Sequence, residues 1–394
     1  MHHQHRASAD VAIVGGGVIG LAVAWRAAAR GLRVTVLERG AVGGGTSRLA
    51  AGMLAPISEA DPSEQPLLAL GIRAAGAYPA FVAALAEASP LDPGYLRCGT
   101  IVAARNADEA EALGRAFRLR GELGLPARRL RPSEARRLEP ALAPTLRLAL
   151  EFPDDHVIDP RALCAALADA ARRAGARIRE GVPVGDVVCG EDRVTGVRLA
   201  GGELIEAGHV LVAAGVWSGM LGGLPERARM PLRPVKGQIL RLHDPAGPGL
   251  LSHVLRMDGG YVVPRGDGRY VIGATMEERG FDETVTAGAL FGLLRDASEL
   301  LPGVSELVID ELSAGFRPGT PDNAPIIGAG TPSGLHWATG HHRHGILLAP
   351  ITAELMLRQL VGDDVPDGPP DEWAAAALSR FAPARFAREL EATR

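Results

Sequence analysis

The stretch 11–20, VAIVGGGVIG, decides the fold of this chain. Its first four residues are apolar and predict a buried strand, and the residues after the glycines predict an apolar helix as far as Arg30. In the pattern Gly15-x-Gly17-x-x-Gly20, the first glycine permits a tight turn and the second lets the backbone approach a pyrophosphate. The third permits close packing of the helix on the strand, and the helix N-terminus then faces the phosphates.

A second strand and an acidic residue complete a strand–helix–strand unit. Residues 33–37 predict the strand. Glu38 follows the glycines by about 20 residues, where a carboxylate can accept a hydrogen bond from a ribose 2′-hydroxyl. A tight strand–helix turn that binds nothing would also use glycines. Because both strands, the helix and Glu38 occur together, dinucleotide binding is the favoured interpretation.

The composition is that of a folded, soluble protein. The chain has 394 residues, of which 47% are hydrophobic and 22% charged, and this length favours two domains. A formal net charge of −4 gives no reason to expect nucleic acid or an anionic membrane as a partner, and we expect no membrane-spanning stretch. The cysteines are odd in number and far apart, so neither a disulfide framework nor a zinc site is expected. A reducing compartment, by default the cytoplasm, is predicted.

A small-residue segment, 43–53, follows the second strand. Small residues let backbone amides pack against a flat ring system, and the hydroxyls of Thr46 and Ser47 can donate to phosphate. A flexible glycine loop is the alternative. The glycine motif does not distinguish NAD from FAD, and this segment alone leaves that choice open.

Motifs along the whole chain make it similar to one family. The chain resembles the D-amino acid oxidase superfamily of flavoenzymes, and within it the glycine oxidases of the thiamine pathway. The glycine motif is common to the superfamily, whereas the stretch 273–276 and the last two matching segments are more specific. The matching segments, in the family's order, are 15–21, 50–53, 155–160, 213–218, 234–238, 261–265, 272–277, 317–322 and 340–350.

The resemblance implies an α/β fold with a Rossmann-like FAD-binding domain and a mixed-sheet α+β substrate domain. The pattern along the chain agrees, because strands alternate with helices at both ends and the middle is rich in strands. We expect a discontinuous FAD-binding domain of residues 1–60, 140–225 and 314–365, a substrate domain of 61–139 and 226–313, and a C-terminal tail of 366–394.

Four residues are expected at the substrate. A guanidinium fork holds a carboxylate through two parallel charge-assisted hydrogen bonds, and the resemblance gives this role to Arg317, in an expected turn at 317–321. The alternative for Arg317 is a surface ion pair. Tyr261 would donate to the same carboxylate, although the residues alone favour a core tyrosine. Met276 would line the pocket instead of packing in the core, and Arg343 would lie near the substrate.

The resemblance also implies a set of cofactor contacts, including a turn before the last long helix. The N-terminus of that helix would favour negative charge on the reduced ring. Three histidines in the turn could instead bind a metal, but no carboxylate or cysteine accompanies them at a recognisable spacing, so no metal is expected. No cysteine lies in the late segment, so FAD is expected to be non-covalent. The expected cofactor-binding residues are Gly15, Gly17, Val18, Ile19, Gly20, Glu38, Arg39, Thr46, Ser47, Ala51, Gly52, Met53, Val184, Gly215, Trp217, His341, His342, Arg343, His344, Gly345, Ile346 and Leu347.

The chain departs from the family's pattern at three places. Arg48-Leu49 stands where serine and alanine are usual, Ser313 where tryptophan is expected, and His344 where asparagine is expected beside the flavin. The last two could alter substrate preference or reactivity towards oxygen. For Lys236, a packing role is favoured over charge balance near the flavin.

The activity implied by the resemblance is hydride transfer from the α-carbon of glycine or another small amino acid to FAD. With O2 as acceptor, this gives an imine or oxo acid, ammonia and H2O2, and the imine would feed thiazole synthesis in the thiamine pathway. Two alternatives stay open: a D-amino acid or sarcosine dehydrogenase that uses another acceptor, and a flavin-binding protein without catalysis. The family also implies a homo-oligomer.

Overall fold

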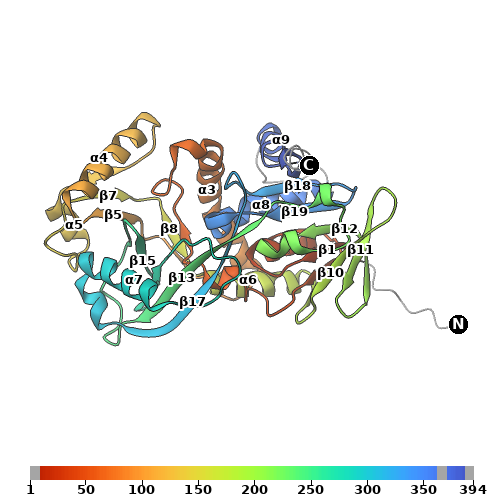
Figure 1. Cartoon of the computed structure of the whole chain (residues 1–394), viewed down its shortest axis with the longest axis horizontal. Helices are drawn as coiled ribbons and strands as arrows, with labels where there is room; N and C mark the ends of the chain where they lie inside the picture. The colour runs from red at the N-terminus through yellow and green to blue at the C-terminus, as the bar shows by residue number, and fades with distance from the viewer. Residues whose placement is uncertain (1–8, 362–370, 387–394) are drawn as a thin grey trace.

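A computed structural model describes residues 9–361 and 371–386. The first eight residues of the expected FAD-binding domain and parts of the C-terminal tail expected at 366–394 lie outside these residues. Two large sheets lie at the two ends of the elongated molecule, as Figure 1 shows, and the long strands β13 and β17 reach from one end towards the other.

The first sheet has the dinucleotide-binding arrangement predicted from the glycine motif. Its centre is parallel: β1 pairs with β2 on one side and with β12 on the other, and β12 pairs with β19. The helix α1 (Val18–Ala29) begins directly after the glycine turn and ends in a turn at Gly31. The eight strands are β1 (Ala9–Val14), β2 (Val34–Leu37), β9 (Arg177–Arg179), β10 (Val184–Cys189), β11 (Val194–Leu199), β12 (Leu204–Val212), β18 (Ile326–Ala329) and β19 (Leu335–Thr339).

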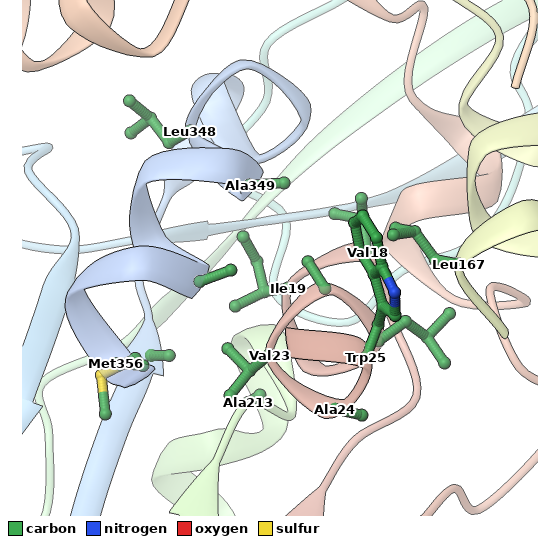
Figure 2. Close-up of a cluster of buried hydrophobic side chains, with 14 of the residues drawn as sticks. Val18, Ile19, Val23, Ala24, Trp25, Leu167, Ala213, Leu348, Ala349 and Met356 are labelled. Atoms are coloured by element: carbon green, nitrogen blue, oxygen red, sulfur yellow. The ribbon is translucent and has the colours of Figure 1, made fainter. Parts of the chain in front are cut away.

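The main core lies where helices cover this sheet. α1 is buried on almost every side, and it packs against α6 (Pro160–Arg173) and α8 (Gly345–Val361). Figure 2 shows α1 side chains such as Ile19 and Trp25 between Leu167 of α6 and Ala349 of α8. The long helix α3 (Gln65–Ala88) joins the same core, so the site's glycine turn is held from several directions.

The second sheet is mixed and also has eight strands, in the order β17-β13-β16-β15-β14-β5-β7-β6. Its helices are α4 (Ala107–Glu122), α5 (Pro132–Leu138) and α7 (Ala287–Leu300), the last capped by the Thr286 side chain. The strands are β5 (Thr100–Ala104), β6 (Arg128–Leu130), β7 (Leu148–Phe152), β13 (Arg233–His243), β14 (Val254–Met257), β15 (Gly260–Pro264), β16 (Arg269–Gly273) and β17 (Val308–Gly319).

Short elements join the two parts. A three-stranded sheet, β3 (Met53–Leu54), β8 (His156–Ile158) and β4 (Tyr95–Leu96), lies between them along the chain. The remaining elements are the short helices α2 (Thr46–Leu49) and α9 (Asp371–Arg380) and the 3-10 turns Pro62–Glu64, Gly215–Met220, Glu226–Ala228, Pro302–Glu306, His342–His344 and Pro383–Phe386.

Several sequence expectations need correction. The turn expected at 317–321 is wrong in its first half, because β17 continues through Gly319 while paired along its length with β13. The sequence at 95–104 predicts a pair of strands, but β4 and β5 belong to different sheets. Two segments belong to the other part of the molecule than expected. β7, expected in the FAD-binding domain, pairs in the second sheet, and α3, expected in the substrate domain, packs in the core of the first.

The expectation that no stretch could span a membrane also needs correction. Among the described residues, α3 alone is long and apolar enough for this by length and composition. The apolar side of α3, with Leu70, Tyr78 and Leu85, is buried in the core shared with α1 and α8. Of the apolar stretch in α3, 33% is buried inside the molecule, so packing of this side in the core accounts for part of its apolar composition.

Candidate active site

One cavity of about 1210 Å³ extends from the glycine turn of the first sheet to the strands of the second. Its walls come from segments far apart in the sequence, so the tertiary fold alone assembles it. A site of this size and length suits a dinucleotide with a small molecule at one end. The four expected substrate residues line it, as do all the expected cofactor residues except Gly20, His344 and Leu347.

The glycine turn is shaped by close backbone approaches. Gly15 has φ +110°, and a Cβ atom on it would lie 2.5 Å from the Ala213 carbonyl oxygen. A Cβ on Gly20 would lie 2.0 Å from the Gly15 carbonyl oxygen. Gly20 therefore does not face the cavity, and its position allows α1 to pack against the turn, which is the role expected for the third glycine.

The N-terminus of α1 opens into the cavity. Gly17, Val18 and Ile19 line it, and Gly17 provides no side-chain cap. The Val18 amide donates to the Ser47 hydroxyl at 3.0 Å. An anion fits here because the amides of the first helical turn and the helix dipole both favour negative charge, which is the chemistry of a pyrophosphate. Thr46 is a different case, since its hydroxyl donates to the Phe316 carbonyl at 2.8 Å and not to the cavity.

The end of β2 forms the ribose and adenine side of the site. The Glu38 carboxylate accepts hydrogen bonds from the amides of Gly16, at 2.8 Å, and Gly40, at 2.9 Å. These bonds hold the carboxylate at the rim of the cavity. The Arg39 guanidinium lies 3.7 Å from the centroid of the Trp217 ring, a cation–π contact that fixes both side chains. Val184 and Gly215 line the same cavity.

The middle of the cavity is walled by the segment 50–53 and by the turn before α8. Gly52 has φ +83°, and a Cβ on it would lie 1.9 Å from the Ile158 carbonyl oxygen, so bare backbone is required here. His341, His342, Gly345 and Ile346 line the opposite wall. The residues thus fit an FAD molecule: helix amides for phosphates, a carboxylate for ribose, and backbone with small side chains for a ring system.

The three histidines of this turn are uncharged at neutral pH. Burial lowers the pKa of His341 to about 3, of His342 to about 3 and of His344 to about 4. His344 points away from the cavity, towards a small second cavity of about 20 Å³ beside Glu59. Among the described residues, no group of three His, Cys, Asp or Glu side chains could hold a metal ion.

The substrate end contains three arginines, and among the described residues two of them, Arg256 and Arg343, have carboxylate partners. Arg256 pairs with Glu59 at 3.3 Å, and Arg343 pairs with Glu64 at 3.6 Å. Arg317 has no carboxylate within ion-pair distance in the part of the chain that the structure describes. It is oriented instead by the Thr275 carbonyl, to which its Nη1 donates at 3.0 Å. An arginine held by backbone and left without a counter-ion is suited to bind an incoming carboxylate.

Tyr261 lies on β15, beside this arginine in the same cavity. Burial raises the pKa of Tyr261 above its usual value, although the charge of Arg317 acts in the opposite direction. The phenol is therefore protonated at neutral pH and can donate a hydrogen bond. Met276 also lines the cavity, with a largely exposed side chain, and does not belong to the core.

Sequence reasoning missed Glu59 and Arg256, which line the substrate end. Burial would raise the pKa of Glu59, but the positive charges of Arg256, Arg343 and Arg317 hold it below its usual value. Glu59 is therefore an anion. Arg256 lies on β14, a strand absent from the sequence prediction, so no alternation pattern could place its side chain.

The departures from the family's pattern lie beside the cavity. Leu49 packs against Gly315, where a Cβ would lie 2.0 Å from Leu49 Cδ1. Arg48 reaches Glu311 at 3.6 Å, and the Ser313 hydroxyl donates to the same carboxylate at 2.5 Å. Arg48 and Ser313 thus meet in one surface ion-pair network.

Comparisons with known proteins agree with this geometry. The family model described as "FAD dependent oxidoreductase" (DAO) matches residues 10–359. A glycine oxidase of Geobacillus kaustophilus is 37% identical, over 88% of this chain and 91% of that protein. A bifunctional protein ThiO/ThiG of Trichormus variabilis is 35% identical over 98% of this chain, which spans 56% of that relative's length.

Solved structures of two oxidases have the same fold as this chain. The crystal structure of the Geobacillus kaustophilus glycine oxidase superposes with a TM-score of 0.85 at 34% identity, covering 96% of this chain and 99% of that one. An iminodiacetate oxidase from Chelativorans superposes with a TM-score of 0.82 at 28% identity, covering 95% and 98%. With the glycine turn, the helix N-terminus and the long cavity in place, the chain belongs to the DAO family of FAD-dependent oxidoreductases.

Proposed function

We propose that the protein oxidises glycine or another small amino acid, with FAD as the hydride acceptor and O2 as the final oxidant. The products are the imine or its oxo acid, ammonia and H2O2. The observation that carries this proposal is Arg317, the substrate-end arginine without a carboxylate partner among the described residues. Relatives named glycine oxidase support glycine as the substrate.

The chain's own residues bind and orient the substrate. Arg317 and the protonated Tyr261 hold the carboxylate, because one supplies charge and a fork of donors and the other a neutral donor. Bound FAD supplies the electron acceptor for the α-hydride. The substrate amine must be neutral for this step, so no catalytic acid is required, and accurate placement of the α-carbon is the main task of the site.

The charges around the site explain why Arg317 is the carboxylate clamp. The anionic Glu59 compensates Arg256, and Glu64 compensates Arg343. A substrate carboxylate placed on either of these arginines would compete with an existing partner. Placed on Arg317, it supplies a counter-ion that the described residues do not, and the planar guanidinium can form two charge-assisted hydrogen bonds with it.

The proposal extends to the protein's surroundings. Bifunctional ThiO/ThiG relatives support a role in supplying the imine to thiazole synthesis in the thiamine pathway. The isolated cysteines support a reducing, cytoplasmic location. We also propose that FAD is bound non-covalently and that the protein forms a homo-oligomer, as the family resemblance implies.

Visible spectroscopy of purified protein with anaerobic glycine tests the proposal. We expect a flavin spectrum that bleaches with glycine, and returns with H2O2 when air is admitted. Arg317→Ala should keep its flavin but require at least about a hundredfold more glycine, because a charged hydrogen bond contributes about 1.5–3 kcal/mol and two are lost. Arg198→Ala, on the first sheet, is the control that should behave as the wild type.

Each alternative gives a different result. A bleached flavin that does not reoxidise in air would indicate a dehydrogenase. Bleaching by sarcosine or a D-amino acid, but not by glycine, would change the substrate and keep the family. Unaltered glycine dependence in Arg317→Ala would exclude this arginine as the clamp.

A further inference from the structure

Glu59 is an anionic side chain at the substrate end of the cavity, and its ion pair with Arg256 does not use all its hydrogen-bonding capacity. The side chain is largely buried, with 13% of it exposed. A carboxylate can accept about four hydrogen bonds, and a buried one needs donors to replace the water that it has lost. The contacts of its two oxygens therefore indicate what kind of ligand it can bind.

Neither carboxylate oxygen of Glu59 accepts a hydrogen bond from a side chain or amide within the described residues. Oε1 lies 3.3 Å from Arg256 Nη2 and forms an ion pair with it. The other terminal nitrogen of that guanidinium, Nη1, donates to the Ser58 carbonyl at 2.7 Å. Oε2 lies 3.8 Å from His344 Nδ1, which is beyond hydrogen-bond distance. The carboxylate therefore has acceptor positions left for a donor in the cavity that Glu59 lines.

The backbone that carries Glu59 is held in place by other side chains. The Asp155 carboxylate accepts hydrogen bonds from the amides of Ser58, at 2.6 Å, and Ile57, at 3.4 Å. The Arg120 guanidinium donates to the carbonyls of the same two residues, each at 3.0 Å. Because these bonds fix the loop from the side of Asp155 and Arg120, the Glu59 carboxylate is not needed to hold it, and its position is set before a ligand arrives.

The charges at the substrate end match those of a zwitterion. Glycine has a carboxylate, which the proposed function places on Arg317, and an amino group that is protonated in neutral solution. Glu59 and this clamp are close enough to interact, because the charge of Arg317 lowers the pKa of Glu59 and the charge of Glu59 raises that of Tyr261. Of the other acidic residues described in the cavity wall, Glu38 lies on the ribose side and Asp258 is exposed to water.

We propose that Glu59 is a specificity-determining residue that binds the amino group of the substrate, so that the cavity selects amino acids over carboxylates without a nitrogen. This inference rests on the proposed amine oxidation and adds the residue that recognises the nitrogen. The N–H groups of glycine donate to Glu59 while the substrate carboxylate lies on Arg317. When the ammonium loses one proton to water before hydride transfer, the neutral amine still has N–H groups for the same contact.

Binding of glycine and acetate to the FAD-loaded protein provides the first test, because acetate has the carboxylate but no nitrogen. The Kd for acetate is measured from its perturbation of the flavin spectrum, and that for glycine from the concentration dependence of anaerobic flavin reduction. In Glu59→Gln the ratio of the glycine Kd to the acetate Kd should rise at least about tenfold, because a charge-assisted contact is replaced by a neutral one. An unchanged ratio would overturn the proposal.

Two matched variants separate this contact from a general effect of charge. Asp258→Asn removes an exposed carboxylate from the wall of the same cavity, and the ratio should change less than about twofold, since water screens that charge. Arg256→Gln removes the ion-pair partner and keeps Glu59, so the ratio should not rise. A rise in either variant as large as that in Glu59→Gln would assign the effect to the field of the cavity or to the ion pair, and would refute the contact.

The pH dependence of flavin reduction gives a second readout. A carboxylate beside an ammonium stabilises its charged form, so Glu59 should raise the pKa of the bound amine. The rate of anaerobic reduction rises with pH as the amine loses its proton, and the midpoint of this rise should lie at lower pH in Glu59→Gln than in the wild type. An equal midpoint in the two proteins would contradict a direct contact.

The test also covers a variant that does not fold and a failure of the proposed function. If Glu59→Gln does not fold, the double variant Glu59→Gln/Arg256→Gln, which leaves no charge of this pair behind, takes its place with the same expected ratio. If no amine bleaches the wild-type flavin, the proposed function fails. Competition of glycine with acetate in the wild type and the variant then still decides whether Glu59 binds an amino group.

Discussion

Gly237 leaves room for Arg317, the proposed carboxylate clamp, and Gly237→Ala is the sharpest test of the site's geometry. On β13, a Cβ at this position would lie 2.5 Å from Arg317 Nη1 and 2.9 Å from its Cζ and Nη2. Since non-bonded heavy atoms settle at about 3.5–4.0 Å, the guanidinium must move by about 1 Å. The obstructing atoms are at the flexible end of a side chain, so the backbone does not need to move.

The expected result is a loss of substrate binding without a loss of fold. Displacement of the fork should break one charged hydrogen bond, about 1.5–3 kcal/mol, which corresponds to a KM for glycine raised roughly 10- to 100-fold. The thermal midpoint and the flavin content should stay close to wild type, because no backbone contact is strained.

The assay is peroxide production at varied glycine concentration, alongside a thermal melt and a flavin spectrum. Gly288→Ala on α7 is the matched control, because a Cβ there meets nothing within 4 Å. An unchanged glycine KM in Gly237→Ala would refute the assignment of Arg317 as the clamp in this geometry. A variant that loses flavin or unfolds would show that the steric cost falls on the backbone instead.

Two further predictions concern cofactor retention and pH. In Gly20→Ala the new Cβ would lie 2.0 Å from the Gly15 carbonyl oxygen, a backbone atom, so we expect a lower thermal midpoint and poor flavin retention; normal flavin content would contradict the packing role. Burial lowers the pKa of His336 to about 4. Because the unfolded chain takes up that proton near pH 6.5 and the folded chain only near pH 4, stability should fall as the pH drops through this window. The fall in thermal midpoint between pH 7 and 4.5 should be smaller in His336→Asn, and an equal fall in both proteins would exclude this histidine as a contributor.

Local features of the sequence predicted the glycine turn on which the cofactor half of the site is built, and the family resemblance supplied the other cofactor residues. The glycine spacing reports backbone approaches that only glycine tolerates, and Gly15 and Gly20 make those approaches in the structure. The predicted helix that runs to Arg30 also matches α1 closely, since an apolar run after a glycine turn is a local signal. The resemblance identified Arg317 and Tyr261, which the structure places in one cavity.

The charged residues at the substrate end could not all be predicted, because their pairing depends on contacts between segments that are distant in the sequence. Glu59 lies after a short strand and Arg256 on an unpredicted one, and they meet only because the two sheets form a common cavity. Lys236 and Asp282, which are 46 residues apart, also meet only in the folded molecule, between β13 and the segment after β16.

The sequence by itself determined the dinucleotide-binding fold with its glycine turn, because the steric limits that select glycine act on the backbone within a few residues. Only the tertiary structure decided which charges are paired. Arg256, Arg343 and Arg317 are chemically alike in the sequence, and the positions of Glu59 and Glu64 leave Arg317 alone without a carboxylate among the described residues. Ion pairing depends on distances across the folded molecule, and no local pattern encodes those distances.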